Sequence, residues 1–268
     1  MLKSRRQALG QHFLVNPGVL QKIVRAISPS QDELIIEVGA GKGALSFPLA
    51  EKAGKVIAVE KDRRLAAGLR GQKVPNLAIV ESDILKIDFQ KLIKKEDRFA
   101  GRVKLVGNLP YSISSLLLFR VLEHKTLFTG CVFLLQKEVA ERISATPGSK
   151  KYAPLSILFQ ISFETRLLFA VSPGSFSPPP KVDSALVSLQ RRPAPLFLIR
   201  EEALFQKFLR GAFAQRRKIL FKNLENLGYL RSRIEDAYQR LQIGHLARPE
   251  ELTISQFVGL FDCLSEDT

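Results

Sequence analysis

Short apolar runs that alternate with helical segments constrain the fold of this chain more than any other feature. Within 33–140 these runs are rich in β-branched residues, and most end in glycine or polar residues: ELIIEVGAGKG, KVIAVE, NLAIVESD, VKLVGNLPY and GCVFLLQKEV. Apolar residues recur with helical spacing in other segments, such as 17–27 with Asn16 as its cap, a segment from about Asp62, and 114–123. Such runs are typical of a parallel sheet covered by helices on both faces. The sequence therefore predicts an α/β fold with a mostly parallel sheet.

The pattern changes toward the end of the chain. Residues 164–171 and 182–189 have the composition of two successive strands with no helix between them, which predicts an antiparallel edge on the sheet. After the linker-like RRPAPLF the remaining segments all have helical spacing. We therefore expect two domains, residues 1–194 and 195–268, of which the second is small and α-helical.

Basic residues outnumber acidic ones in this chain. It has 41 Lys and Arg against 26 Asp and Glu, a net charge of +15. Such an excess favours polyanionic partners, either nucleic acid or an anionic membrane surface, and charge alone leaves a merely basic protein open. No apolar run approaches the roughly 18 residues that a membrane-spanning helix needs. We therefore expect a protein with no membrane association.

Composition also bears on location and on metal binding. The start of the chain, MLKSRRQALGQHFL, lacks the apolar core of a signal peptide. Two cysteines fit a reducing compartment better than a disulfide framework, so the cytoplasm is the expected location. The three histidines are far apart in sequence, and neither cysteine has a neighbour at metal-ligand spacing. No metal site is expected.

A glycine loop follows the first predicted strand of the sheet. Gly39, Gly41 and Gly43 lie in EVGAGKGA, where glycine lets the backbone turn tightly and approach a ligand closely. Glu60 ends the next strand, and its carboxylate can accept hydrogen bonds from both hydroxyls of a ribose. This spacing satisfies the dinucleotide-binding fingerprint, so a nicotinamide dehydrogenase is an open alternative on this motif. A Walker loop is excluded because no Gly-Lys-Ser/Thr follows.

Two acidic residues favour S-adenosylmethionine (SAM) as the cofactor. Glu37 precedes the first glycine, a placement more typical of SAM sites than of dinucleotide sites. Asp83 ends the third strand, where it can accept a hydrogen bond from an adenine amino group, and the alternative is that it only caps a helix. The glycine loop thus indicates a nucleoside-like cofactor without identifying it.

The segment Asn108-Leu109-Pro110-Tyr111 follows the fourth strand and faces the same edge of the sheet, because ligands lie outside the carboxyl ends of parallel strands. The Asn108 side-chain oxygen and the Leu109 carbonyl can each accept one hydrogen of an exocyclic amine. Pro110 fixes the backbone so that the two acceptors converge. Tyr111 offers a flat face on which a base can stack.

Two converging acceptors would make an aromatic amine nucleophilic. They draw its nitrogen toward a tetrahedral geometry, in which the lone pair is localised and can attack the activated methyl group of SAM. The alternative is an ordinary β-turn, for which these residue types are also suitable. Because the segment occurs together with the glycine loop and the ordered strands, we favour the site.

Together, these motifs resemble the ribosomal RNA adenine N6-dimethyltransferases of the KsgA/RsmA family. The resemblance covers about residues 9–260, and its most specific segments are GNLPYSIS and FSPPPKVDS. The other matching segments occur in the family's order: LGQHFLVNP, IIEVGAGKGALS, VIAVEKD, LLQKEVAERI and AFAQRRKILFKNL. The resemblance implies a Rossmann-like SAM-dependent methyltransferase sheet with a small C-terminal α-helical domain that binds RNA.

The resemblance also implies roles for residues outside these strand ends. His12 and Leu14 would contact SAM, chiefly through their backbone, and Gly39 would line the methionine part. Phe176 would close over the second face of the target base. The implied substrate is a pair of adjacent adenines in the 3′-terminal hairpin loop of 16S ribosomal RNA, within the assembling small subunit. A monomer is the simplest expectation.

Basic side chains outside the predicted cofactor site are candidates for RNA contact through phosphates. If residues 210–222 form one helix, its basic residues lie along neighbouring faces. The alternative is a solvated helix face. The candidates are Lys137, Arg142, Lys150, Lys151, Arg210, Arg216, Arg217, Lys218 and Lys222.

Two other functions stay open at this point. An Erm-type enzyme would methylate adenine in large-subunit ribosomal RNA, and the segments QKEVAERI and FSPPPKVDS favour the small-subunit enzyme over it. A non-catalytic factor could bind the ribosome or nucleic acid with the same fold. The presence of Glu60, Asp83 and Asn108 argues against that alternative, because a pure binding protein does not need them.

Overall fold

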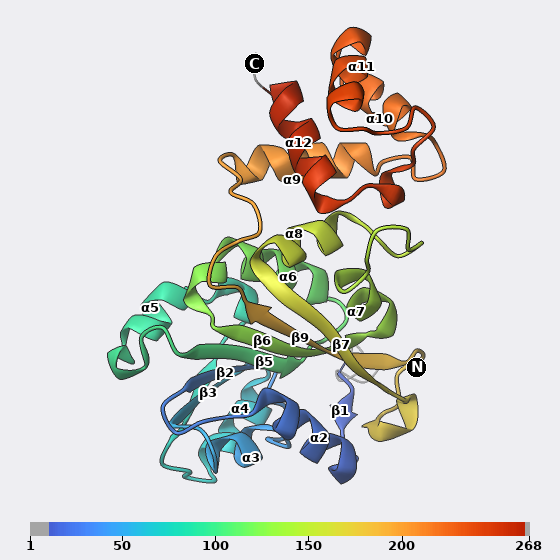
Figure 1. Ribbon diagram of the computed structural model, residues 1–268. Helices are drawn as coiled ribbons and strands as arrows, with labels where there is room; N and C mark the ends of the chain where they lie inside the picture. Colours follow the sequence, from blue (N-terminus) through green and yellow to red (C-terminus); the bar gives the residue numbers. More distant parts are fainter. Residues whose placement is uncertain (1–10, 266–268) are drawn as a thin grey trace. The chain divides into compact units, whose positions relative to one another are not determined.

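The computed structural model describes residues 11–265. The first ten residues, on which the expectation about a signal peptide largely rests, lie outside this range. The chain divides into two compact units (Figure 1). The first holds Met1–Ala140 and Glu164–Arg191, and the second holds Glu141–Phe163 and Arg192–Thr268. Residues 141–163, which precede the expected domain boundary, thus group with the C-terminal helices.

A seven-stranded sheet forms the centre of the first unit. The first five strands in the order run parallel, and β9 then pairs antiparallel with β6. The predicted sheet, mostly parallel with an antiparallel edge, is therefore confirmed. In spatial order the strands are β4 (Leu77–Glu81), β3 (Lys55–Glu60), β2 (Leu34–Val38), β5 (Val103–Asn108), β6 (Gly130–Gln136), β9 (Ser184–Arg191) and β7 (Phe163–Val171).

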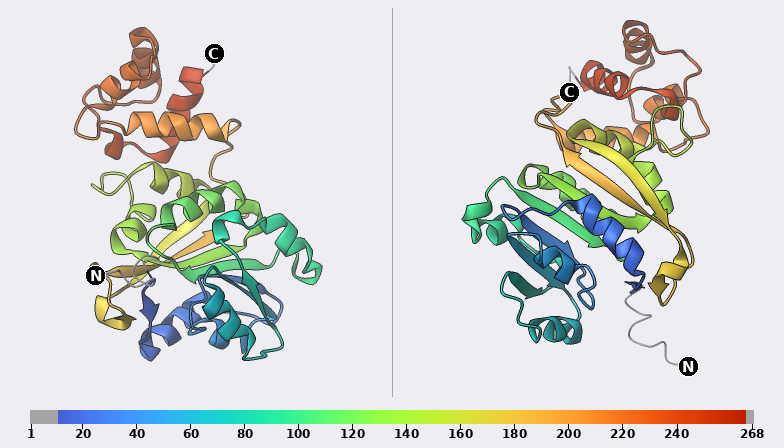
Figure 2. Two further views of the ribbon diagram at one scale, coloured as in Figure 1. Left: turned by 180° about the vertical axis from the view of Figure 1, so that it is seen from behind. Right: turned by 60° about the horizontal axis from the view of Figure 1, so that its bottom comes forward.

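Helices cover both sides of this sheet, because its central strands are apolar on both faces. Figures 1 and 2 show α3 and α4 on one side and α6 on the other. As predicted, Asn16 caps the first helix with its side chain, and the helix expected from about Asp62 is α4, which the Asp62 side chain caps. The helices of this part of the chain are α2 (Pro17–Ile27), α3 (Ser46–Ala50), α4 (Arg63–Arg70), η1 (Ile84–Lys86), α5 (Phe89–Lys94), η2 (Asp97–Phe99), α6 (Ser114–Glu123), η3 (Lys125–Leu127), α7 (Lys137–Ile143) and η4 (Pro173–Ser175).

A second, two-stranded sheet lies in the same unit. Strand β1 (Phe13–Leu14) pairs antiparallel with β8 (Phe176–Ser177), so the N-terminal segment lies against the start of FSPPPKVDS. The backbone N–H of Val15 adds a hydrogen bond to Ser175 O at 2.9 Å. This pairing brings together two motifs that are far apart in sequence.

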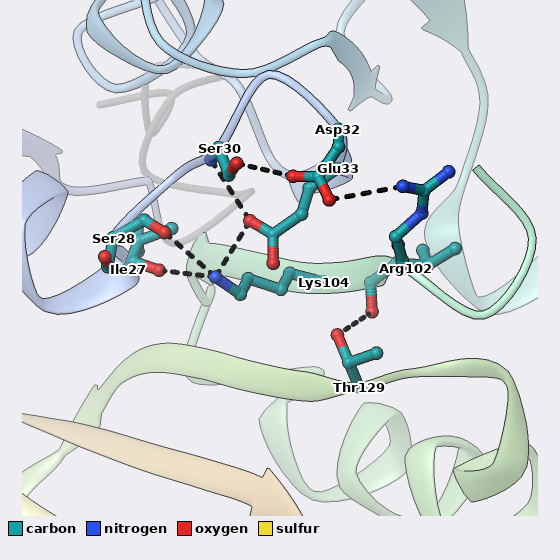
Figure 3. Close-up of polar contacts among 9 residues, drawn as sticks. Ile27, Ser28, Ser30, Asp32, Glu33, Arg102, Lys104 and Thr129 are labelled. Atoms are coloured by element: carbon teal, nitrogen blue, oxygen red, sulfur yellow. Dashed lines mark hydrogen bonds and ion pairs between the residues drawn. The ribbon is translucent and has the colours of Figure 1, made fainter. Parts of the chain in front are cut away.

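A half-buried lysine fixes the end of α2 to the sheet. Lys104 on β5 donates from Nζ to the carbonyl oxygens of Ile27 and Ser28, each at 3.0 Å, and to the Glu33 carboxylate at 2.9 Å (Figure 3). A cation at a helix C-terminus satisfies carbonyls that have no partner within the helix. This cluster lies at the amino ends of β2 and β5, where Leu34 pairs with Val103.

The second unit has its own core of aromatic and aliphatic side chains. Phe205 packs edge-on against Phe261 with ring centroids 5.2 Å apart, and Ile157 and Ile161 join the same cluster. These contacts explain why the segment around α8 groups with the C-terminal helices. The helices are α8 (Pro154–Ser162), α9 (Glu202–Ala212), α10 (Leu220–Asn226), α11 (Arg231–Arg240), η5 (Pro249–Glu251) and α12 (Ile254–Ser265).

No helix within residues 11–265 is long and apolar enough to cross a membrane.

Candidate active site

A cavity of about 460 Å³ lies at the carboxyl ends of the parallel strands β2 to β5. The strand order places the glycine loop, Glu60, Asp83 and Asn108 after four neighbouring strands, so their side chains converge there. The cavity is lined by every residue predicted for cofactor binding or catalysis except Phe176: His12, Leu14, Gly39, Gly41, Glu60, Asp83, Asn108, Leu109, Pro110 and Tyr111.

The glycine loop needs glycine for its backbone conformation. Gly39 has a φ of 71° and Gly41 a φ of 59°, in the left-handed region that disfavours residues with a Cβ atom. At Gly41 a Cβ atom would also lie 3.1 Å from the ring of Phe13. The backbone N–H of Gly41 donates to the Glu60 carboxylate at 2.8 Å, so the loop is fastened to the next strand.

Glu60 is buried at the end of β3 and lines the cavity. Its two oxygens each accept one backbone hydrogen bond at 2.8 Å, from Gly41 and from Asp62. A carboxylate has about four acceptor positions, so each oxygen can still accept a hydrogen bond from a ligand. This geometry suits the two hydroxyls of a ribose.

Glu37 is a second buried acid in the cavity wall. It is 2% exposed, and Ser46 Oγ donates to its carboxyl at 2.5 Å. Burial is the main reason that its pKa is raised to about 7; the Ser46 hydrogen bond opposes this increase, and the nearby charge of Glu60 adds to it. The cavity wall therefore holds a carboxyl group whose pKa lies near neutral pH.

Asp83 lines the cavity and also caps a helix, the alternative role that its sequence position allowed. Its Oδ1 atom accepts from Leu85 N at 3.0 Å and caps the short helix η1, and its Oδ2 atom forms an ion pair with Lys61 Nζ at 2.9 Å. The hydrogen bond from Lys61 lowers the pKa of Asp83. The side chain is thus an ionised acceptor at the cavity wall, which suits the amino group of an adenine.

The Asn108 amide has a fixed orientation. Its Nδ2 atom donates to the backbone oxygen of His12 at 2.9 Å, which leaves the side-chain oxygen as the atom that can accept a hydrogen bond from a ligand. The His12 ring is engaged through Nδ1 with the Pro178 carbonyl at 2.8 Å. The backbone carbonyl of His12 therefore orients the Asn108 amide, and a contact of His12 with SAM stays a prediction.

Tyr111 is held on two sides. Its hydroxyl is 2.8 Å from Ser184 Oγ, and its ring lies 5.8 Å from the His12 ring, centroid to centroid. Phe176 differs from the other predicted residues, because it is 4% exposed and packs in a cluster with Leu14 and Val171. It does not line the cavity. Its contact with a target base stays a prediction.

The candidate RNA contacts divide into paired and unpaired side chains. Lys151 pairs with Glu141, and Arg216 donates to the carbonyl oxygens of Lys150 and Tyr152 at 2.6 and 2.8 Å. Lys137 lies 3.9 Å from Asp183, and Lys222 lies 2.7 Å from Glu225. Among the described residues, Lys150, Arg217 and Lys218 have exposed side chains without an ion pair.

Residues 210–222 do not form one helix, so the condition under which their basic residues would lie along neighbouring helical faces is not met. Helix α9 ends at Ala212 and α10 begins at Leu220, so Arg217 and Lys218 lie in the connection between them. The buried amide of Asn223 donates to the carbonyls of Ala212 and Gln215 and thereby stabilises the turn. Nothing in the sequence marks Asn223 as different from other helix residues, so the spacing of residues 210–222 does not predict the break between the two helices.

Several side chains that organise the cavity were not identified from sequence. Lys61 lines the cavity and pairs with Asp83, Ser46 contacts Glu37, and Ser184 contacts Tyr111. Lys61 follows Glu60 directly, and Ser184 is the last residue of FSPPPKVDS. Their positions within these motifs are the sequence features that could have identified them.

The order of the strands helps to define the class of protein. Dinucleotide-binding sheets follow the parallel order 3-2-1-4-5-6. Here the parallel order continues through β6 and then gives way to the antiparallel β9. Together with the cavity at the strand ends and the Asn-Leu-Pro-Tyr segment that lines it, this sheet defines a Rossmann-like, SAM-dependent methyltransferase.

Comparison with known proteins identifies the family. The family model for ribosomal RNA adenine dimethylase matches residues 2–266. The chain is 40% identical to ribosomal RNA small subunit methyltransferase A of Geobacter sulfurreducens, over 95% of this chain and 93% of that protein. It is also 40% identical to the protein of the same name from Bordetella pertussis, over 97% and 94%. The chain therefore belongs to the ribosomal RNA adenine dimethylase family.

Solved structures agree with this assignment. A dimethyladenosine transferase from Plasmodium falciparum is similar with a TM-score of 0.77 and 28% identity, over 93% of this chain and 96% of that one. The 23S rRNA methyltransferase ErmE is similar with a TM-score of 0.72 and 25% identity, over 95% and 100%. The nicotinamide alternative is therefore excluded.

Proposed function

We propose that this protein transfers methyl groups from SAM to the N6 amines of two adjacent adenines in the 3′-terminal hairpin loop of 16S ribosomal RNA, two to each amine. One observation carries this proposal, the fixed amide of Asn108. Because Nδ2 donates to the His12 carbonyl, the amide oxygen is the free acceptor at the cavity. An acceptor is what an adenine amine requires before it can act as a nucleophile.

The residues around this amide bind and position the target adenine. The cofactor supplies an activated methyl group when bound. Asn108 Oδ1 and the Leu109 carbonyl accept the two hydrogens of the amine, and the Tyr111 ring stacks on the base. Stacking of this kind contributes about 1–3 kcal/mol per base. Positioning of the two reactants then accelerates the transfer, and no strong general base is required.

Two considerations support the small-subunit RNA as the substrate. The chain is 40% identical to proteins named for the small subunit, and 25% identical to an enzyme named for 23S rRNA. The target adenine must leave its stack to reach Tyr111, so an accessible loop is a suitable substrate. We expect the protein to act as a monomer, in the cytoplasm, on the assembling small subunit.

The basic surface would hold the phosphates of this RNA. The net charge of +15 and the exposed Lys150, Arg217 and Lys218 support binding that weakens as salt increases. The candidates that are engaged within the protein, such as Arg216, would support this surface by fixing the loop at Lys150.

The test is transfer of labelled methyl from SAM to small ribosomal subunits that lack the modification. Wild type is compared with Asn108→Ala and with Asn226→Ala, the same change at an exposed helix position in the second unit. Nucleotide mapping locates the product. We expect dimethyladenine in the 3′-terminal hairpin with wild type and Asn226→Ala, and a rate about 100-fold lower with Asn108→Ala.

Two other outcomes would contradict the proposal. Methylation of large-subunit RNA alone would favour the Erm-type alternative. Tight binding to the small subunit without transfer by wild type would favour a binding factor, and the Asn-Leu-Pro-Tyr segment would then be a turn.

A further inference from the structure

Arg120 on α6 reaches the segment that follows β4 and binds its backbone. Its Nη1 atom donates to the Ile84 carbonyl at 3.2 Å and also contacts the Leu85 carbonyl, and its Nη2 atom donates to the Ile87 carbonyl at 2.6 Å. The guanidinium lies over the ring of Phe89, 5.2 Å from its centroid. Arg120 is half-buried and does not line the cavity.

The peptide group between Ile84 and Leu85 connects this arginine to Asp83. Its carbonyl accepts from Arg120, and its N–H donates to Asp83 Oδ1 at 3.0 Å. Because a peptide group is planar, fixing its carbonyl also fixes the direction of its N–H. A cation at the oxygen polarises the group and strengthens the hydrogen bond on its other side.

We infer that Arg120 is a positioning residue that acts through this peptide group on Asp83 and thereby sets the selectivity of the cavity for an adenine base in the cofactor. The inference rests on the proposed role of Asp83 toward the adenine amino group. Ile84, whose backbone Arg120 holds, is itself 4% exposed and lines the cavity. Arg120 therefore fixes both the polar contact and the adjoining apolar wall.

Lys61 does not provide the same constraint. Its ion pair with Asp83 involves a side chain that is 65% exposed, so water screens the pair and the long side chain keeps much of its freedom. It holds the carboxylate from the solvent side, whereas Arg120 holds the backbone that carries it. The Arg120 contact adds to the backbone hydrogen bonds that hold this segment in the cavity wall, such as the one from Ser82 N–H to the Glu60 carbonyl at 3.0 Å.

Of the three carbonyls that Arg120 contacts, that of Ile84 also accepts from the Ile87 N–H at 3.3 Å within the short helix η1. The carbonyls of Leu85 and Ile87 lie toward the C-terminal end of this helix, where carbonyls need partners from outside the helix. A guanidinium has five N–H donors fixed in a rigid plane, whereas an ammonium group has three donors at a single atom and cannot span carbonyls as far apart. A lysine at position 120 would therefore replace the arginine only in part.

The experiment is calorimetric titration of the full-length protein with S-adenosylhomocysteine and with its analogue that carries hydrogen in place of the 6-amino group. The ratio of the two dissociation constants measures the contact with the amino group alone. Wild type is compared with Arg120→Met, Arg120→Lys and Arg102→Met. Arg102 is the matched control, because it also donates to a backbone carbonyl, that of Arg98 at 2.8 Å, away from the cavity.

We expect wild type and Arg102→Met to bind the adenine compound about tenfold tighter than the analogue, as for a hydrogen bond to a charged group. Arg120→Met should lower this ratio at least about threefold, and Arg120→Lys should fall between, because weaker positioning costs the contact only in part. A purely structural role would weaken both ligands equally and leave the ratio unchanged, which would overturn the inference.

Two further outcomes are decisive. If wild type does not distinguish the two ligands, Asp83 does not bind the amino group and the inference fails, while methyl transfer to RNA tests the proposed function separately. If Arg120→Met does not fold, Arg120→Lys decides by the same ratio, and a value equal to wild type overturns the inference.

Discussion

The hydroxyl of Tyr111 lies 2.8 Å from the hydroxyl of Ser184, and this contact joins the Asn-Leu-Pro-Tyr segment to the first residue of β9. Ser184 is 1% exposed and cannot move without disturbing the sheet. Burial raises the pKa of Tyr111, so its hydroxyl stays protonated and can donate across the contact. The tilt of the Tyr111 ring, on which a target base would stack, is thus set by the sheet.

Loss of this contact should reduce methyl transfer without abolishing it. We expect Tyr111→Phe and Ser184→Ala each to lower the single-turnover rate about three- to tenfold, because each removes one net hydrogen bond. The double variant should be no slower than either single variant, since both remove the same interaction. Ser184→Thr, which keeps a hydroxyl, should restore most of the rate. Rates that multiply in the double variant would show that the two residues act independently.

The buried Glu37 predicts that stability depends on pH. Its pKa is raised from 4.5 to about 7 in the folded protein. Below about pH 4.5 the group is protonated in both the folded and the unfolded chain. Between that pH and about 7 the unfolded chain releases this proton while the folded protein keeps it, so stability falls as pH rises. At 1.36 kcal/mol per pH unit, the free energy of unfolding should decrease by about 3 kcal/mol across this range.

Urea unfolding at a series of pH values measures this effect. Glu37→Gln keeps an acceptor for Ser46 and cannot ionise, so the difference between wild type and this variant isolates the contribution of Glu37. We expect the variant to gain stability relative to wild type as pH rises from 4.5 to 7. A difference that is constant over that range would mean that Glu37 titrates normally in the folded protein.

The Lys104 cluster in Figure 3 should matter for stability and not for the cofactor. Lys104→Met removes the donor to Ile27 and Ser28 and leaves the Glu33 carboxylate, which is 16% exposed, without its ion pair. We expect a loss of about 2–3 kcal/mol in the free energy of unfolding. SAM affinity should be unchanged, because the cluster lies at the amino ends of the strands. Arg102→Met, in the exposed part of the cluster, should cost much less, and an equal loss would contradict this account.

The chain's periodicity and residue types made much of the cavity predictable. In a parallel sheet the carboxyl ends of neighbouring strands meet at one edge, so finding the strands also located Gly39, Glu60, Asp83 and Asn108 together. The Asn16 cap and the start of a helix near Asp62 were predictable for a local reason, since a capping side chain contacts its own helix within three residues.

Contacts between distant segments were not predictable in the same way. The strands β1 and β8 have two residues each, too few to show a period, and their pairing joins segments more than 160 residues apart. Arg120 is the one basic residue of a mostly apolar helix, and its acceptors are backbone carbonyls, which cannot be recognised from residue type. The break before Leu220 depends on one amide in the following helix.

The conformation of the glycine loop gives the sharpest separation of cofactor binding from stability. At Gly41 the φ of 59° is unfavourable for alanine by about 1–2 kcal/mol, and the new Cβ atom would also press on Phe13 at 3.1 Å. Because Gly41 N–H donates to Glu60, a shift of the loop would also disturb the Glu60 carboxylate, which suits the ribose hydroxyls. We expect Gly41→Ala to weaken SAM binding about tenfold or more, measured by calorimetry.

Gly101→Ala is the matched control. Gly101 has a φ of 73°, and no atom lies within 4 Å of the added Cβ atom, so this variant should lose similar stability and keep its SAM affinity. Equal affinity losses in the two variants would mean that backbone strain anywhere in this unit impairs the cofactor site, and that the loop has no special part in it.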